Sequence, residues 1–135
     1  EDDKESMPDQ YKTVSLEEFV EYSKSMFAYW TEDDFASSFR KMLTIEQFRS
    51  EEMQGLYQQY LSSGPAAYVK DLFESMGIAH AEENAVRFYA TMYFYYSVYD
   101  GADDKEKVKN EFASAIGSMA QEWIKQPKLT QIRKS

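Results

Sequence analysis

Chemistry that depends on histidine has one candidate in this 135-residue chain, His80. A serine or threonine nucleophile needs a positioned base, and the Gly-x-Ser-x-Gly turn that carries such a serine in many hydrolases does not occur. A di-iron helical bundle needs two Glu-x-x-His pairs, whereas His80-x-x-Glu83 runs in the reverse order. We therefore expect His80 to be a surface or helix-start residue and the chain not to be an enzyme.

Metal and cofactor chemistry is also poorly supported. The chain has no cysteine, which excludes thiolate sites, and its five glycines are too scattered to form a phosphate-binding loop. Asp100-Gly-Ala-Asp-Asp104 clusters three acids but lacks the glutamate and the ligand spacing of a calcium loop. We expect a solvated turn there, and neither a metal nor a cofactor.

Aromatic residues and methionines are the side chains most open to a functional role. The chain has eleven tyrosines, nine phenylalanines, two tryptophans and seven methionines. An ordinary core accounts for most of them, but buried phenols need hydrogen-bond partners, and methionines fit irregular cavities. Such a lining suits an amphipathic organic ligand, and aromatic rings with nearby carboxylates could also hold a cation.

The charge distribution argues against direct contact with DNA. The net charge is −9, and residues 1–34 hold eleven acids and three bases. Phosphates would be repelled by that surface, and no segment is both basic and helix-turn-helix in pattern. The most apolar run, residues 88–99, is too short for a bilayer span of roughly 20 residues. The sequence therefore predicts a soluble protein without a membrane segment.

The elements that must position these side chains are helices. Residues 1–14 read as a flexible acidic tether and residues 127–135 as a basic tail, leaving one domain over residues 15–126. Ser15-Leu-Glu-Glu18 is a capping box, and Thr31-Glu-Asp-Asp34 supplies a second helix start. Helices are expected over 15–30, 31–43, 50–64, 65–77, about 82–99 and about 104–125, with Phe35, Phe39, Met42 and Leu43 as the inward stripe of the second.

The fifth and sixth of these helices carry more apolar surface than one face can hold. Seven aromatics fall within residues 88–99, and Phe94 points roughly 160° away from Met92. The run 93–99 has strand propensity, but no second β-rich run could pair with it. In the sixth helix, Gly117 belongs to a small-residue stripe beside a stripe of large residues. A single copy is therefore expected to leave apolar surface that a second copy covers.

Several motifs resemble the C-terminal domain of TetR/AcrR-type transcriptional regulators. The most specific is Arg40-Lys-Met-Leu-Thr-Ile-Glu-Gln-Phe-Arg49, followed by Leu56-Tyr-Gln-Gln-Tyr60. The similarity continues through Ser62-Ser-Gly-Pro65, Val69-Lys-Asp-Leu-Phe73 and Gly77-Ile78, and covers residues 14–77 best. It implies an all-α, antiparallel bundle of about six helices, which dimerises through its last two helices as a four-helix bundle.

The resemblance also implies positions for two sites. In this family the middle helices enclose an effector cavity, and the last two helices pair with their twins. By position, the ligand-binding candidates are Phe39, Phe48, Tyr57, Tyr60, Tyr68, Phe73, Tyr89 and Tyr93. The dimer-interface candidates are Phe88, Met92, Tyr95, Tyr99, Phe112, Ile116, Gly117, Ala120 and Trp123.

The family's N-terminal helix-turn-helix is absent from this sequence, so DNA would be bound only through a missing segment. The implied function is a cytoplasmic, homodimeric repressor domain that binds a small hydrophobic or cationic organic effector. Effector binding then favours a dimer shape that no longer fits the operator. The alternative is a free-standing helical adaptor that binds another protein through the same aromatic surface.

Overall fold

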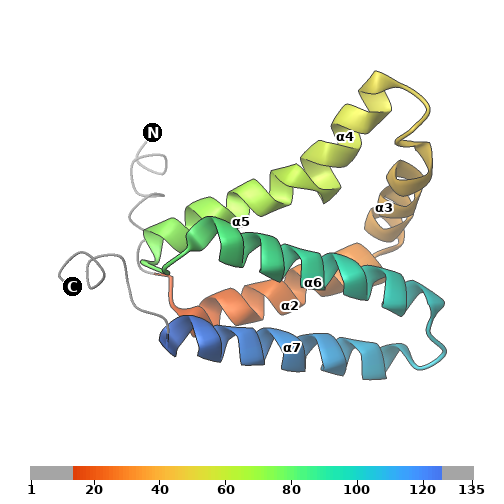
Figure 1. Ribbon diagram of the computed structural model, residues 1–135. Helices are drawn as coiled ribbons and strands as arrows, with labels where there is room; N and C mark the ends of the chain where they lie inside the picture. The colour runs from red at the N-terminus through yellow and green to blue at the C-terminus, as the bar shows by residue number, and fades with distance from the viewer. Residues whose placement is uncertain (1–13, 126–135) are drawn as a thin grey trace, which may run out of the picture.

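A computed structural model describes residues 14–125 of the chain (Figure 1). Its elements are α2 (Leu16–Glu32), α3 (Asp34–Glu46), α4 (Glu51–Leu61), α5 (Ser63–Ser75), α6 (Ala81–Gly101) and α7 (Lys105–Lys125). The described residues contain no strand, so the predicted all-α bundle is confirmed. The strand-prone run 93–99 lies inside α6, where helical packing prevails over local propensity. The predicted tether and tail lie outside the described residues, except for Val14 at the end of the tether.

Helix α6 is the centre of the bundle. It packs between α5 and α7, and α2 contacts both α6 and α7 (Figure 1). Helices α4 and α5 follow one another along one side, while α3 joins α2 to α4 at one end. A single large core lies between α2, α5, α6 and α7, and Phe19, Phe73, Phe88 and Trp123 meet inside it.

Local capping signals set several helix boundaries. The Ser15 hydroxyl accepts from Glu18 N at 3.0 Å and the Glu18 carboxylate accepts from Ser15 N at 2.9 Å, so the predicted capping box is confirmed. The second helix start is capped by Asp33, which accepts from Ala36 N at 2.9 Å. Thr31 instead lies in α2 and donates its hydroxyl to Phe27 O at 2.7 Å.

The inward stripe predicted for the second helix is wrong in part. Phe35 is 73% exposed and Met42 is also exposed, whereas Ala36, Arg40 and Leu43 are buried. Helix α3 therefore turns a different face toward the core than the prediction gives. That face carries the Arg40 guanidinium, whose charge is satisfied by hydrogen bonds to Trp30 O and to the Asp100 carboxylate. A stripe drawn from hydrophobicity alone could not include a buried arginine.

The boundary between α4 and α5 also differs from the prediction that Gly64 ends a helix. Helix α4 ends at Leu61, Ser62 takes the non-helical angles φ −132° and ψ −103°, and α5 begins at Ser63. Gly64 lies in the first turn of α5, where a Cβ atom would overlap the Gln59 carbonyl oxygen. The glycine is therefore needed for close approach of two backbones at the bend.

Alanine at Gly64 should destabilise the fold. We expect Gly64→Ala to lower the free energy of unfolding by about 2 kcal/mol, because a backbone oxygen must shift to admit the methyl group. Gly55 in α4 provides a matched control, since nothing lies within 4 Å of its Cβ position. Gly55→Ala should raise stability by roughly 0.5–1 kcal/mol through helix propensity. Urea denaturation of both variants tests the pair, and equal effects would contradict this view of the bend.

Candidate ligand-binding cavity

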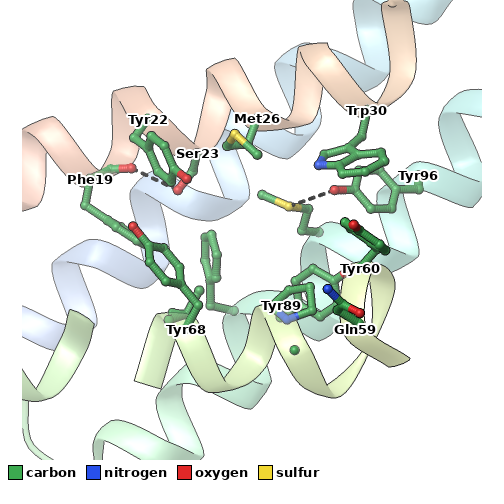
Figure 2. A pocket seen from close by; sticks show the side chains of 15 residues that line it. Phe19, Tyr22, Ser23, Met26, Trp30, Gln59, Tyr60, Tyr68, Tyr89 and Tyr96 are labelled. Carbon is green, nitrogen blue, oxygen red and sulfur yellow. Dashed lines mark hydrogen bonds between the residues drawn. The ribbon is translucent and has the colours of Figure 1, made fainter. Parts of the chain in front are cut away.

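A cavity of about 260 Å³ that is partly open to solvent lies between α2, α4, α5 and α6 (Figure 2). Helix α2 forms one wall, and α4 and α5 form the opposite wall around their bend. The lining residues are Phe19, Tyr22, Ser23, Met26, Trp30, Gln59, Tyr60, Gly64, Pro65, Tyr68, Val69, Phe88, Tyr89, Met92 and Tyr96. The cavity is therefore mainly aromatic and apolar, with a few hydroxyl and amide groups.

The lining divides into a mouth and a deep wall. Tyr22, Tyr60 and Tyr68 are each more than 40% exposed and lie at the mouth. The deep wall consists of buried residues from α2, α5 and α6, which are Phe19, Ser23, Val69, Phe88, Tyr89, Met92 and Tyr96. A ligand that enters would pass an amphipathic rim and reach an apolar interior, the arrangement found in most small-molecule sites.

The bend at Ser62 helps to make this space. It separates α4 from α5, so that Gln59 and Tyr60 approach the cavity from one helix and Tyr68 from the other. Gly64, which has no side chain, and Pro65 line the cavity beside the bend. The local sequence Ser62-Ser-Gly-Pro65 thus shapes the backbone and the cavity together.

The hydroxyl groups of the deep wall are bound within the protein. Ser23 donates to Phe19 O at 2.8 Å, and Tyr96 donates to Met92 Sδ at 3.2 Å (Figure 2). Tyr89 donates to Leu61 O at 2.6 Å and so ties α6 to the last turn of α4. Among residues 14–125, no lysine, arginine, aspartate or glutamate lines the cavity.

An ion pair between the buried Arg40 and the more exposed Asp100 supports two walls of the cavity. The Arg40 guanidinium binds the two carboxylate oxygens of Asp100 at 3.0 and 2.8 Å. It also donates to Trp30 O at 3.0 Å and stacks 4.9 Å from the centroid of the Tyr96 ring. Trp30 and Tyr96 both line the cavity, so Arg40 fixes two of its walls relative to α3. The sequence alone does not indicate this role, because Arg40 and Asp100 are far apart in the chain.

Burial changes the acidity of the tyrosines near the cavity. Desolvation raises the pKa of Tyr89 and of Tyr96 above the ordinary value, and the charge of Arg40 opposes the shift only in part. Desolvation and the hydrogen bond with the Tyr57 hydroxyl raise the pKa of Tyr93 to about 12. All three phenols are therefore neutral at physiological pH.

These shifts predict a loss of stability in alkali. A phenol with a raised pKa in the folded state stabilises the fold fully below the unfolded pKa of about 10, and that contribution is lost as the pH rises toward the folded pKa. We expect the free energy of unfolding to fall between about pH 10 and pH 12. Tyr89→Phe should make that fall shallower in urea titrations at several pH values. An equally steep fall in the variant would contradict the assignment to Tyr89.

Three of the ligand-binding candidates line the cavity, namely Tyr60, Tyr68 and Tyr89. Phe39 does not line the cavity, but its ring packs edge-on against that of the lining residue Tyr60, with the ring centroids 5.5 Å apart. The other four candidates do not line it. The hydroxyl groups of Tyr57 and Tyr93 are hydrogen-bonded to each other. Phe73 is fully buried in the core, and Phe48 is 84% exposed.

Helix α2 supplies lining residues that the sequence analysis did not single out. Phe19, Ser23, Met26 and Trp30 follow one another at helical spacing along its inner face. Ser23 gave the available signal, since a serine lies between Phe19 and Phe27 in an apolar stripe. That signal did not distinguish a cavity wall from a serine whose hydroxyl bonds its own helix.

The dimer-interface candidates lie mostly inside a single copy. Phe88, Met92, Tyr99, Phe112, Ile116, Ala120 and Trp123 are buried within the described chain, and Tyr95 and Gly117 are half-buried. Helix α2 covers the inner face of α6 and α7, as Phe27 shows by stacking on Phe112 at 4.3 Å. One copy therefore covers seven of these nine residues by itself, and the dimer interface stays a prediction.

The remaining candidates for chemistry lie away from the cavity. His80 is exposed before α6 with a left-handed backbone, φ 54°. Asp100 is engaged with Arg40, and residues 14–125 contain no group of three or more potential metal-ligating side chains. Within the same residues, no helix has the length and apolarity required to cross a bilayer.

Comparison with known proteins adds no relative. No protein-family model matches the chain, and neither a curated protein nor a solved structure matches it.

Proposed function

We propose that the chain is the effector-binding and dimerisation domain of a TetR-like transcriptional regulator. The observation that carries the proposal is the aromatic cavity between α2, α4, α5 and α6, at the middle helices that the resemblance assigns to an effector. Its volume of about 260 Å³ and mixed lining suit a small organic molecule. Within the described part of the chain the lining residues carry no charge, which favours binding over acid-base catalysis.

The proposed mechanism is a shift between two shapes of the domain. An effector in the cavity touches α2 on one side and the α4–α5 bend on the other, so its binding favours one spacing of these helices. Such a ligand regulates only if it binds the two shapes unequally. DNA contact is assigned to a helix-turn-helix encoded before Glu1. The upstream coding sequence tests that assignment, and an unrelated domain there would contradict it.

The proposed homodimer uses the outer face of α6 and α7. On this face Phe94 is 60% exposed, and Tyr95, Val98 and Met119 are half-buried against the core. These side chains replace the buried candidates as the surface on which a second copy would pack. Sedimentation at micromolar concentration tests the assembly, and a persistent monomer would contradict it.

Blocking the cavity should abolish ligand binding while leaving the fold intact. Met26 is half-buried in the cavity lining, so the larger ring of Met26→Trp would occupy ligand space. We expect this variant to bind the apolar fluorophore N-phenyl-1-naphthylamine at least tenfold more weakly than the unmodified chain. Met42→Trp is the matched control, because Met42 is exposed on α3 outside the cavity. Fluorescence titration measures both, and equal binding by the two variants would contradict the proposal.

The adaptor function is supported by a different surface. Phe35, Ile45 and Phe48 are each more than 70% exposed at the α3 end of the bundle. Exposed apolar side chains in such numbers favour a protein contact. If the adaptor function holds, the upstream coding sequence should lack a helix-turn-helix and Met26→Trp should leave the protein's cellular activity unchanged.

A further inference from the structure

The hydrogen bonds of the deep cavity wall have a common direction. Ser23, Tyr89 and Tyr96 each donate the hydroxyl proton to a group of the protein, at 2.8, 2.6 and 3.2 Å respectively. A hydroxyl has one hydrogen to donate and two lone pairs that accept. With the hydrogen engaged, each of these oxygens offers a ligand only an acceptor. The deep wall therefore complements a donor, whereas the ring N–H of Trp30, elsewhere in the lining, is a donor that an acceptor on the ligand could bind.

The charge around the cavity favours a neutral ligand. The lining residues that the structure describes include neither a carboxylate nor a basic side chain, so a charged ligand would lose its hydration without an ion-pair partner among them. The Arg40 guanidinium lies 4.9 Å from the centroid of the Tyr96 ring, and its bidentate bond with Asp100 neutralises its charge. A cation would find no unpaired carboxylate among the described lining residues, and an anion would face the acceptor oxygens.

We infer that the effector is an uncharged aromatic compound that carries an N–H or O–H donor on the part that enters the deep wall. The inference rests on the function proposed above and narrows its ligand class from hydrophobic or cationic compounds to neutral donors. Aromatic rings from α2 and α6, among them Phe19, Phe88 and Tyr96, supply faces for the ring system. At the mouth, Gln59 and Tyr60 carry polar groups that accommodate either kind of substituent.

A pair of isosteric compounds tests the direction of the hydrogen bond. The compounds 2-phenylindole and 2-phenylbenzofuran have the same shape, but the ring N–H of the first is an oxygen in the second. We expect 2-phenylindole to bind about fivefold more tightly, the ratio typical of one neutral hydrogen bond. Isothermal titration calorimetry measures both. Equal binding, or tighter binding of the benzofuran, overturns the inference while the proposed function stands, and binding of neither compound counts against both.

Removal of single acceptor oxygens identifies the source of the preference. Ser23→Ala and Tyr96→Phe each delete one oxygen from the deep wall. We expect the variant that loses the acceptor of the indole N–H to bind the two compounds equally, with benzofuran affinity unchanged. Tyr95→Phe is the matched control, because Tyr95 neighbours Tyr96 in sequence but does not line the cavity. It should keep the fivefold ratio. A ratio that survives in Ser23→Ala, Tyr96→Phe and Tyr89→Phe alike overturns the inference.

Discussion

Replacing Asp100 by alanine should lower the free energy of unfolding by about 3 kcal/mol, because it leaves the Arg40 guanidinium buried without its carboxylate. The Arg40 side chain is 6% exposed and that of Asp100 is 28% exposed, so solvent compensates only in part. Asp100 also lies in the last turn of α6, where the helix dipole disfavours an acid. Its position is explained by the bond to Arg40 rather than by the helix itself.

The double variant Arg40→Met with Asp100→Ala separates the pair from its surroundings. Because the double variant has neither charge, it leaves no buried cation without a partner. It should therefore recover most of the stability that Asp100→Ala alone loses. Urea denaturation of the two single variants and the double variant gives the coupling energy. A loss below about 1 kcal/mol for Asp100→Ala would contradict a structural role for the pair. Asp100→Ala should also weaken binding of N-phenyl-1-naphthylamine, because Trp30 and Tyr96 lose their common support.

Replacing Phe73 by alanine should also cause a large loss in the free energy of unfolding. Phe73 is fully buried, and its ring centroid lies 5.1 Å from that of Phe19, 6.3 Å from that of Phe88 and 4.7 Å from that of Trp123. Phe73→Ala removes these contacts and leaves a cavity in the core, so we expect a loss of about 3–5 kcal/mol. Urea or thermal denaturation measures the loss.

Phe48→Ala is the matched control for Phe73→Ala. Phe48 is 84% exposed, and its removal should change stability by less than about 0.5 kcal/mol. The two phenylalanines were both ligand-binding candidates, so this comparison also separates a core role from a surface role. Similar losses in both variants would contradict the packing described for the core.

Local signals account for the parts of the fold that the sequence predicted. Ser15 and Ser50 begin helices because a hydroxyl followed by acids caps the first turn, and this pattern is contained in a few residues. Gly77 likewise marks the end of α5, since its φ of 78° suits the left-handed residue after a helix. The strand propensity of residues 93–99 does not prevail, because the described residues contain no strand with which this run could pair.

Long-range packing accounts for the parts that the sequence did not predict. The inner face of α3 contains Arg40, and its partner Asp100 lies at the far end of another helix. Periodicity identified Phe88, Phe112 and Trp123 as apolar faces but could not show that α2 covers them within one copy. The cavity wall on α2 was missed for the same reason, because a core stripe and a cavity stripe have the same spacing.

The methionine methyl groups provide the most direct test of the cavity as a ligand site. Met26 and Met92 line the cavity, whereas Met42 and Met53 lie outside it on α3 and α4. In the chain labelled with 13C at its methionine methyl groups, N-phenyl-1-naphthylamine should shift the signals of Met26 and Met92 and leave those of Met42 and Met53 in place. Shifts at Met42 or Met53 without shifts at Met26 and Met92 would contradict the account.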